Sequence, residues 1–299
     1  MALTERDRRI ISWVYKMRFL TREQIQRLEF SPTTESYAKR RLMLLYQHGY
    51  LDRRPLLMDT AFGSSKPLYC LDSKGADWLA YAWKIERSEL SWKPRDTQVS
   101  DYFMRHLLDS NDFSISVTLA AQEKGWPVEW IDEATLKSAE MKDYVTDPGQ
   151  PGKVAVVPDG YFSLHNVPIQ GTPRRASFAL ELDRGNMEPR PWKRKIRAYI
   201  AWWGSGQYQA RYNTSSLRVL TVVSAARRAR DPAHEKELIE DGVERLLAWT
   251  EEAGGRRMFW FTAAHKVDQS TVFETPIWRV ATAAGVYPLI GDSTSSAGS

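Results

Sequence analysis

The sequence predicts two domains of mixed α+β and α/β class: a helical domain with a β-hairpin over residues 1–97, and an α/β sheet domain over residues 98–299. At 299 residues, the chain exceeds the usual domain length of about 100–200 residues. The stretch "RSELSWKPRDTQVSD" is polar, contains a proline and has no apolar period, as is typical of a linker. The first 97 residues contain 18 Lys and Arg against 12 Asp and Glu, whereas the remainder is nearly neutral. The first domain is therefore the better candidate to meet a polyanion.

The composition fits a folded protein of the cell interior. Hydrophobic residues make up 42% of the chain, and every apolar run is well short of the about 20 residues that would span a bilayer. The opening "MALTERDRRI" carries charges where a signal peptide would be apolar, so we expect a cytoplasmic protein without a membrane partner. The single cysteine, Cys70, excludes an internal disulfide framework and a cysteine-rich zinc site.

Three helices are predicted in the first domain. Residues 4–17 place apolar side chains at i, i+3, i+4 and i+7. Residues 21–28 begin with a threonine and carry a glutamine three positions later, the pattern of a capping box. Residues 31–49 begin with Ser-Pro and end with glycine, as helices often do. The predicted core stripe of this third helix is Ala38, Leu42 and Leu45.

A hairpin and a closing helix complete the first domain. The stretches "YLDRRP" and "PLYCLD" read as short strands, and "SKGADWLAYAW" as a helix. This order is that of a winged helix-turn-helix, whose third helix enters the major groove while the wing touches the DNA backbone. The candidate DNA-binding residues are Thr33, Ser36, Tyr37, Arg40, Arg41, Arg53, Arg54 and Lys66.

Two other interpretations of the first domain stay open. Arg40 and Arg41 could simply belong to a solvated helix face. Some winged helices bind protein instead of DNA. The local positive charge, together with hydroxyl and tyrosine side chains at the start of the third helix, favours phosphate and base contacts.

The second domain is predicted to contain a helix, three strands, a helix, a strand, a helix and a strand. The first helix starts at Ser100, with a break considered at "SNDFS", and "KDYVTDPGQPGK" is expected to be a loop. The strands are "WPVEWI", "VAVVPDGYFSL", "FALELDRG", "LRVLTVV" and "RMFWFTA", and the later helices span residues 188–203 and 232–249. This pattern predicts an α/β sheet domain.

Two of these predicted strands contain acidic residues. Asp159 lies in a Pro-Asp-Gly at a kink, and Glu181 and Asp183 share one face of their strand because strands have a period of two. If the two strands pair, three carboxylates converge near one end of the sheet, where Mg²⁺ or Mn²⁺ would suit the oxygen ligands. The alternative is that both segments are ordinary turns, since Pro-Asp-Gly is a common turn sequence.

The combination resembles a known family. Pro158-Asp159-Gly160, followed by Glu181-x-Asp183-Arg184-Gly185 and by Lys195 and Tyr199, resembles the PD-(D/E)XK nuclease-like superfamily. Behind a winged helix, "VVPDGYFSL", "FALELDRG" and "KIRAYI" look like the replication-relaxation family of plasmids and integrative elements. The resemblance implies a restriction-endonuclease-like domain over residues 98–299, a role in initiating replication or processing mobile DNA, and metal binding by Asp159 and Glu181.

One position departs from the superfamily pattern. Asp183 stands where the usual catalytic lysine is expected. Lys195 on the following helix is the candidate replacement, because it adjoins the predicted buried stripe of Trp192, Ile196, Tyr199, Ile200 and Trp203. The basic residues around Lys195 could instead form a solvated face or grip phosphate without chemistry.

The predicted domains and site residues support two candidate functions. In the first, Asp159, Glu181, Asp183 and Lys195 form a catalytic site that nicks or cleaves DNA with Mg²⁺ or Mn²⁺. In the second, the protein is a sequence-specific DNA-binding initiator or regulator without a cofactor, and its nuclease-like domain serves assembly or partner binding. Double-stranded DNA is the expected partner in both, and a homodimer and replication or conjugation proteins are further candidate partners.

Overall fold

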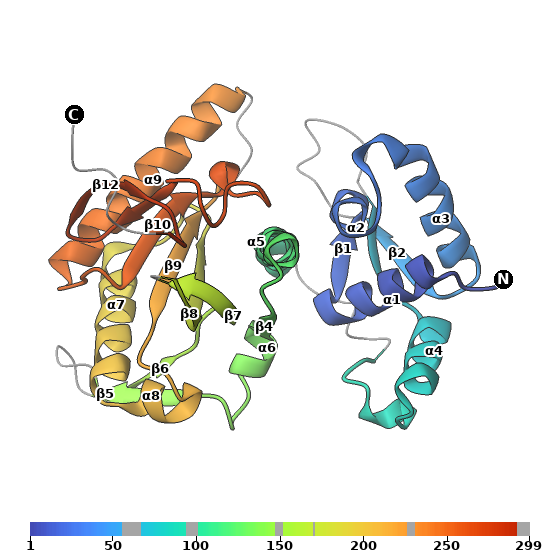
Figure 1. Cartoon of the computed structure of the whole chain (residues 1–299), viewed down its shortest axis with the longest axis horizontal. Helices are drawn as coiled ribbons and strands as arrows, with labels where there is room; N and C mark the ends of the chain where they lie inside the picture. Colours follow the sequence, from blue (N-terminus) through green and yellow to red (C-terminus); the bar gives the residue numbers. More distant parts are fainter. Residues whose placement is uncertain (56–66, 94–100, 147–151, 170, 226–230, 292–299) are drawn as a thin grey trace. The chain divides into compact units, whose positions relative to one another are not determined.

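The structure is a computed structural model with two compact units, Met1–Ile115 and Ser116–Ser299 (Figure 1). The residues that it describes are 1–55, 67–93, 101–146, 152–169, 171–225 and 231–291. The predicted boundary at residue 97 lies outside them, and the first unit extends through Ile115. None of the helices in this described part is long and apolar enough to cross a membrane.

The first unit contains the predicted order of helix, short helix, helix, hairpin and closing helix. Its small antiparallel sheet has the strand order β1-β3-β2. The elements are α1 (Glu5–Met17), β1 (Phe19–Thr21), α2 (Arg22–Glu29), α3 (Glu35–Gln47), β2 (Leu51–Pro55), β3 (Pro67–Leu71) and α4 (Ser73–Trp83). Short 3-10 turns cover Pro32–Thr34 and Arg87–Glu89.

Capping explains where the first helices begin. Thr21 and Gln24 form the predicted capping box of α2, and Thr4 and Asp7 form another at the start of α1. The third helix differs from the prediction, because Ser31 and Pro32 open a 3-10 turn and the α-helix starts only at Glu35. The predicted core stripe of α3, consisting of Ala38, Leu42 and Leu45, is buried.

Arg41 ties α3 to α1 instead of facing outward. Its Nε donates a 2.5 Å hydrogen bond to Oδ1 of Asp7, which is fully buried, and its Nη2 donates to Oδ2. Burial alone would raise the pKa of Asp7, but the hydrogen bonds from Arg41 and Thr4 lower it overall. A buried carboxylate depends strongly on such a partner, so Arg41 is engaged in holding the first unit together.

Helix α5 (Asp101–Lys124) explains why the first unit reaches Ile115. Its Met104 and Leu108 pack with Phe19, Leu68 and Cys70. Asn111 donates hydrogen bonds to the carbonyls of Met17 and Phe19, at 3.1 and 2.8 Å. The break considered at "SNDFS" is absent, since the helix runs unbroken through this stretch.

The second unit is built on a mixed sheet of seven strands in the order β12-β11-β10-β9-β8-β7-β4. Its strands and helices are β4 (Val128–Asp132), α6 (Glu133–Leu136), β5 (Asp143–Thr146), β6 (Lys153–Val156), β7 (Gly160–Ile169), β8 (Thr172–Asp183), α7 (Pro189–Gly204), α8 (Gln207–Tyr212), β9 (Arg218–Val223), α9 (Pro232–Glu252), β10 (Phe259–Ala263), β11 (Trp278–Val280) and β12 (Ala283–Tyr287). Strands β4, β7 and β8 are antiparallel neighbours, whereas β8, β9 and β10 run parallel. Helices α7 and α9 lie on the crossovers between the parallel strands, as a βαβ arrangement requires.

The stretch "VAVVPDGYFSL" divides between two sheets. Its first part is β6, which pairs with β5 in a separate two-stranded sheet, and its second part is β7 of the large sheet. Asp159 lies between them. Strand β5 falls where the sequence predicted a loop, β6 falls mostly within the predicted strand, and β11 and β12 were not predicted.

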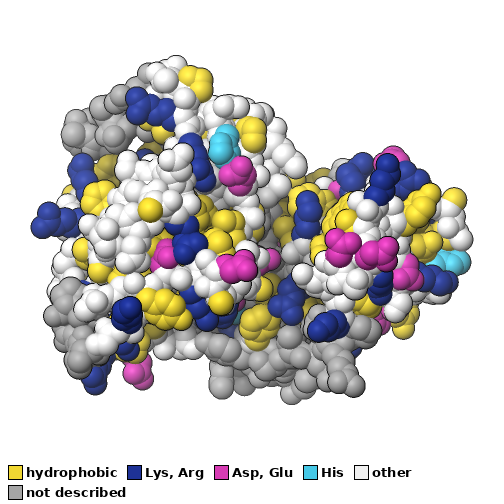
Figure 2. All heavy atoms as spheres, turned by 90° about the horizontal axis from the view of Figure 1, so that it is seen from below, with side chains coloured by type: hydrophobic (Ala, Val, Ile, Leu, Met, Phe, Trp, Pro, Cys, Tyr) yellow, Lys and Arg dark blue, Asp and Glu magenta, His cyan; other side chains and the backbone are white. Residues whose placement is uncertain are grey.

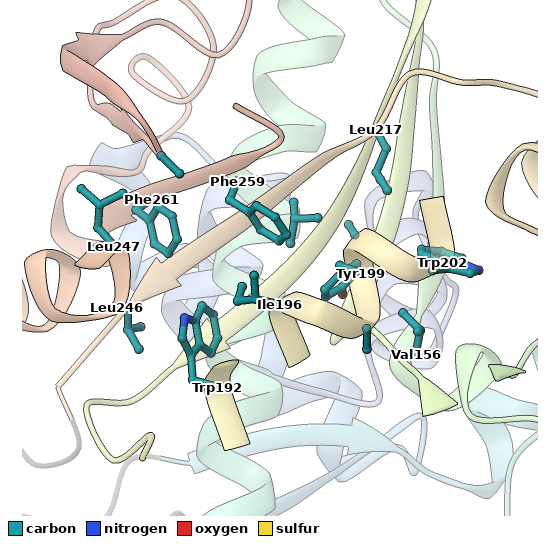
Figure 3. Close-up of a cluster of buried hydrophobic side chains, with 14 of the residues drawn as sticks. Val156, Trp192, Ile196, Tyr199, Trp202, Leu217, Leu246, Leu247, Phe259 and Phe261 are labelled. Carbon is teal, nitrogen blue, oxygen red and sulfur yellow. The ribbon is translucent and has the colours of Figure 1, made fainter. Parts of the chain in front are cut away.

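The main core of the second unit lies between α7, α9 and the parallel strands (Figure 3). Trp192, Ile196 and Tyr199 of α7 are buried there, as predicted. The stripe then continues through Trp202, whereas Trp203 is 43% exposed, so the predicted assignment of Trp203 was wrong. The helical period brings positions 192, 195, 196 and 199 to the sheet-facing side, which positions the site described next.

Candidate active site

Glu181 is a buried carboxylate in an otherwise apolar interface. It follows Leu180 in β8 and faces the helix-covered side of the sheet, beside Thr221 of β9 in the register of the parallel strands. Only 2% of the residue is exposed. A carboxylate in such surroundings needs hydrogen-bond donors, because burial of an unpartnered charge is costly.

Helix α7 supplies those donors. Lys195 Nζ donates a 2.5 Å hydrogen bond to Glu181 Oε2, and Tyr199 Oη donates one of 2.5 Å to Glu181 Oε1. Lys195 and Tyr199 are four residues apart, so they lie on the same face of the helix. The structure thus brings Lys195 to Glu181, and Tyr199 becomes part of the site instead of only the core.

The pKa values of Glu181 and Lys195 depend on each other and on the charge of Asp159. Burial, with the negative charge of Asp159 adding to it, raises the pKa of Glu181 to about 7, although Lys195 opposes the shift. Burial would lower the pKa of Lys195, but Glu181 and Asp159 raise it overall. Lys195 therefore keeps its positive charge, while Glu181 changes its protonation near neutral pH.

Asp159 is hydrogen-bonded to the two residues of β8 that flank Glu181. Its backbone N–H donates to the carbonyl of Leu180 at 2.9 Å, and its Oδ2 accepts from the N–H of Leu182 at 2.8 Å. Asp159 is therefore bonded to a neighbouring strand and not within a local turn, and it is also an electrostatic neighbour of Glu181 and Lys195.

Asp159, Glu181 and Asp183 do not converge, which corrects the expectation of a site of three carboxylates. Among the described residues, the oxygens of Asp159, Glu181 and Asp183 do not form a group of three within 4.8 Å of one another. Glu181 is turned toward α7, whereas Asp183 Oδ2 accepts from the N–H of Gly185 at 3.1 Å. Burial raises the pKa of Asp183, and its Oδ1 is buried without a hydrogen-bond partner in the described structure.

Glu133 is an acid that the sequence interpretation missed. One of its carboxylate oxygens lies within 4.8 Å of one of Asp159, and Lys137 pairs with the same side chain. Glu133 opens α6 directly after β4, and the last residue of β4 pairs with Gly160 of β7. Only the register between these strands reveals this proximity, so no local motif could have indicated it.

The structure gives the predicted DNA-binding residues of the first unit different surroundings. Thr33, Ser36, Tyr37 and Arg40 are exposed on the 3-10 turn and α3. Arg53 lies over the ring of Tyr46 at 5.1 Å, and Arg54 lies 3.8 Å from Asp52. Arg41 is held by Asp7, and Lys66 is outside the described residues. On the face drawn in Figure 2, Lys and Arg side chains lie among Asp and Glu side chains.

The buried carboxylate predicts a pH-dependent stability. The pKa of Glu181 is about 7 in the folded protein against an ordinary 4.5, so the folded state holds a proton that the unfolded chain releases between these values. The free energy of unfolding should therefore fall as pH rises through this window. Glu181→Gln should flatten this fall, by on the order of 2 kcal/mol.

Urea unfolding at about pH 5 and pH 7.5 measures this effect. Glu5→Gln, at a carboxylate whose side chain is 75% exposed and whose partner Arg8 stays charged, is the matched control and should keep the wild-type slope. A Glu181→Gln profile parallel to that of the wild type would contradict the assigned pKa shift.

Comparison with known proteins places the chain in a family. The replication-relaxation family model matches residues 11–217, and no curated protein matches the chain. The solved structure of the restriction endonuclease FokI is similar over 87% of this chain and 42% of that chain, with 10% sequence identity and a TM-score of 0.26. This chain thus corresponds to less than half of the FokI chain, and a likeness at this TM-score carries no argument. The family match covers more than half of the residues, and the protein therefore belongs to the replication-relaxation family.

Proposed function

We propose that the protein binds double-stranded DNA of a plasmid or other mobile element and nicks or cleaves it with a divalent metal during replication or processing. The observation that carries this proposal is the hydrogen bond from Lys195 to Glu181, beside Asp159. Position 183, where the nuclease superfamily has its catalytic lysine, is occupied by Asp183 in this chain. In this proposal Lys195 of α7 takes the role of that lysine. The second unit would then be a PD-(D/E)XK nuclease-like domain whose lysine comes from a helix.

The donor set suits Mg²⁺ or Mn²⁺. Asp159 and Glu181 offer hard oxygen ligands. Burial, with a smaller contribution from the negative charge of Asp159, raises the pKa of Glu181, and a bound cation would favour its ionised form. Glu133 is a further carboxylate near Asp159, although among the described residues Asp159, Glu181 and Glu133 do not form a group of three within 4.8 Å of one another. When bound, such an ion would polarise a phosphoryl oxygen and activate water.

The chain's own groups have separate roles in this proposal. Tyr199 fixes the orientation of Glu181, and burial keeps its hydroxyl protonated by raising its pKa. Lys195 is about one third exposed and carries the positive charge that would meet a phosphate. Asp183 is bonded to its own turn and has no place among the metal ligands.

A second candidate function is supported by one specific observation. Both oxygens of Glu181 already accept hydrogen bonds, from Lys195 and Tyr199. A buried carboxylate satisfied in this way can be a structural element of a domain that no longer cuts. The protein would then be a DNA-binding initiator or regulator whose second unit serves assembly or partner binding.

Plasmid nicking separates the two candidates. With supercoiled plasmid and Mg²⁺ or Mn²⁺, we expect wild-type nicking that rises as pH passes about 7, because Glu181 must be deprotonated to bind metal. Asp159→Ala, Glu181→Gln and Lys195→Met should each lower the rate by about 100-fold or more. Glu237→Ala serves as the exposed acidic control.

Two outcomes of that assay would decide against cleavage at this site. Nicking that persists in all three variants would place the chemistry elsewhere. A wild-type protein that fails to nick under any of these conditions would support the non-catalytic candidate.

In this proposal the first unit is a winged helix that reads DNA with α3. Support comes from the exposed hydroxyl and basic residues at the start of this helix and from the antiparallel hairpin that follows it. Arg41 is left out of the contact set because Asp7 engages it. A homodimer on paired half-sites, with replication or conjugation proteins as further partners, is part of the same proposal.

Arg40→Ala tests this DNA contact. Loss of one phosphate contact should weaken duplex binding by about 3- to 10-fold and reduce the slope of log K against log[salt] by about 0.9. Fluorescence anisotropy at several salt concentrations measures both. Arg8→Ala, at an exposed arginine paired with Glu5, is the control; an Arg40→Ala protein that matches it in affinity and slope would refute the contact.

A further inference from the structure

A cavity of about 370 Å³ lies in the second unit between residues 154–157 and the first half of α7. Glu181, Lys195 and Tyr199 form part of its lining. The cavity thus adjoins the candidate active site without including Asp159 in its lining. Its other lining residues have no role in the chemistry proposed above.

The charge of the lining favours an anion. Arg190, Arg194 and Lys195 contribute three cations, and Glu181 contributes the one carboxylate among the lining residues described. Lys195 is bonded to Glu181, and the lining as a whole carries more positive than negative charge. Arg190 is exposed and makes no ion pair or hydrogen bond with any residue in the described ranges.

The spacing of the arginines suits a phosphate. Arg190 and Arg194 are four residues apart and therefore lie on one face of α7, and both line the cavity. A guanidinium matches phosphate oxygens with two parallel N–H donors and stays charged at all relevant pH values. Two such groups on one wall are a better match for a phosphate than for a single carboxylate.

The opposite wall is apolar. Residues 154–157, with the sequence Val-Ala-Val-Val, face the basic helix across the cavity, and Pro191 and Ala198 add further apolar surface. A ligand with a phosphate and a flat organic body matches this combination. The volume lies at the lower end of the range of about 300–1,000 Å³ for small-ligand sites, which suits one nucleotide and excludes a base-paired duplex.

The apolar wall is held in place before any ligand binds. Asp143 of the β5–β6 hairpin pairs with Arg211 at 2.5 Å and accepts a 2.8 Å hydrogen bond from Trp202 Nε1. Burial would raise the pKa of Asp143, but these donors lower it overall, so it stays ionised and paired. Val156 packs into the main core on the same hairpin. A preformed wall reduces the cost of binding.

We propose that this cavity binds one unpaired nucleotide of a DNA strand, with its phosphate on Arg190 and Arg194 and its sugar and base against residues 154–157. This inference depends on the proposed function in one respect only, which is that the ligand is DNA. Binding requires neither metal nor cleavage, so the two can fail separately.

The test uses a 3′-fluorescein-labelled tetrathymidylate with a 5′-phosphate, bound to the full chain in EDTA and followed by fluorescence anisotropy. The double variant Arg190→Gln/Arg194→Gln should weaken binding at least 10-fold, because two charge-assisted phosphate contacts are lost. Ala155→Trp should weaken it similarly by filling the cavity, since Ala155 is exposed and the charge is unchanged.

Lys193→Ala is the matched control. Lys193 is on the same helix but pairs with Glu252 and does not line the cavity, so binding should stay within twofold. The proposal is overturned if the wild type does not bind the probe, if the cavity variants bind as the wild type does, or if Lys193→Ala weakens binding as much as they do. Circular dichroism verifies that each variant is folded.

Discussion

The arrangement of the second unit depends on one buried carboxylate. Glu181 lies in the main core between the sheet and α7, where an isolated negative charge would be strongly destabilising. Lys195 and Tyr199 satisfy its two oxygens, and this requirement sets the rotation of α7 against the sheet. The same contacts bring the lysine beside Asp159, so packing and candidate chemistry share one set of atoms.

This arrangement also shapes the surface next to the site. Because Lys195 and Tyr199 point to Glu181, Arg190 and Arg194 on the same helix lie along the neighbouring cavity. The hairpin that closes the cavity is tied to α7 and α8 through Asp143, Trp202 and Arg211. The hydrogen bonds from α7 to Glu181 therefore also place Arg190 and Arg194 at the cavity.

Local periodicity predicted most of this core. The period of two indicated that Glu181 and Asp183 share a face, and the helical period placed Lys195 next to the buried stripe of α7. Periodicity did not show that Asp183 is bonded to Gly185, nor that Trp202 rather than Trp203 is buried. The bonding of Asp183 depends on the turn that follows β8, and the burial of Trp202 depends on the turn that follows α7.

Other features depend on contacts between distant segments and could not be read from a local pattern. Glu133 approaches Asp159 only through the register of β4 with β7, and Arg41 meets Asp7 only once α1 and α3 pack. Strand β5 was missed because it lies in a stretch rich in turn residues, and it forms only by pairing with β6.

The candidate metal site is tested most directly by asking whether Asp159 and Glu181 together bind a divalent ion. Titration of the protein with Mn²⁺ at about pH 8, followed by the electron paramagnetic resonance signal of the free ion, counts the bound ions. We expect one bound Mn²⁺ per chain in the wild type and its loss in both Asp159→Ala and Glu181→Gln. Equal binding in the wild type and both variants, or no binding in the wild type, would refute a metal site at these two acids.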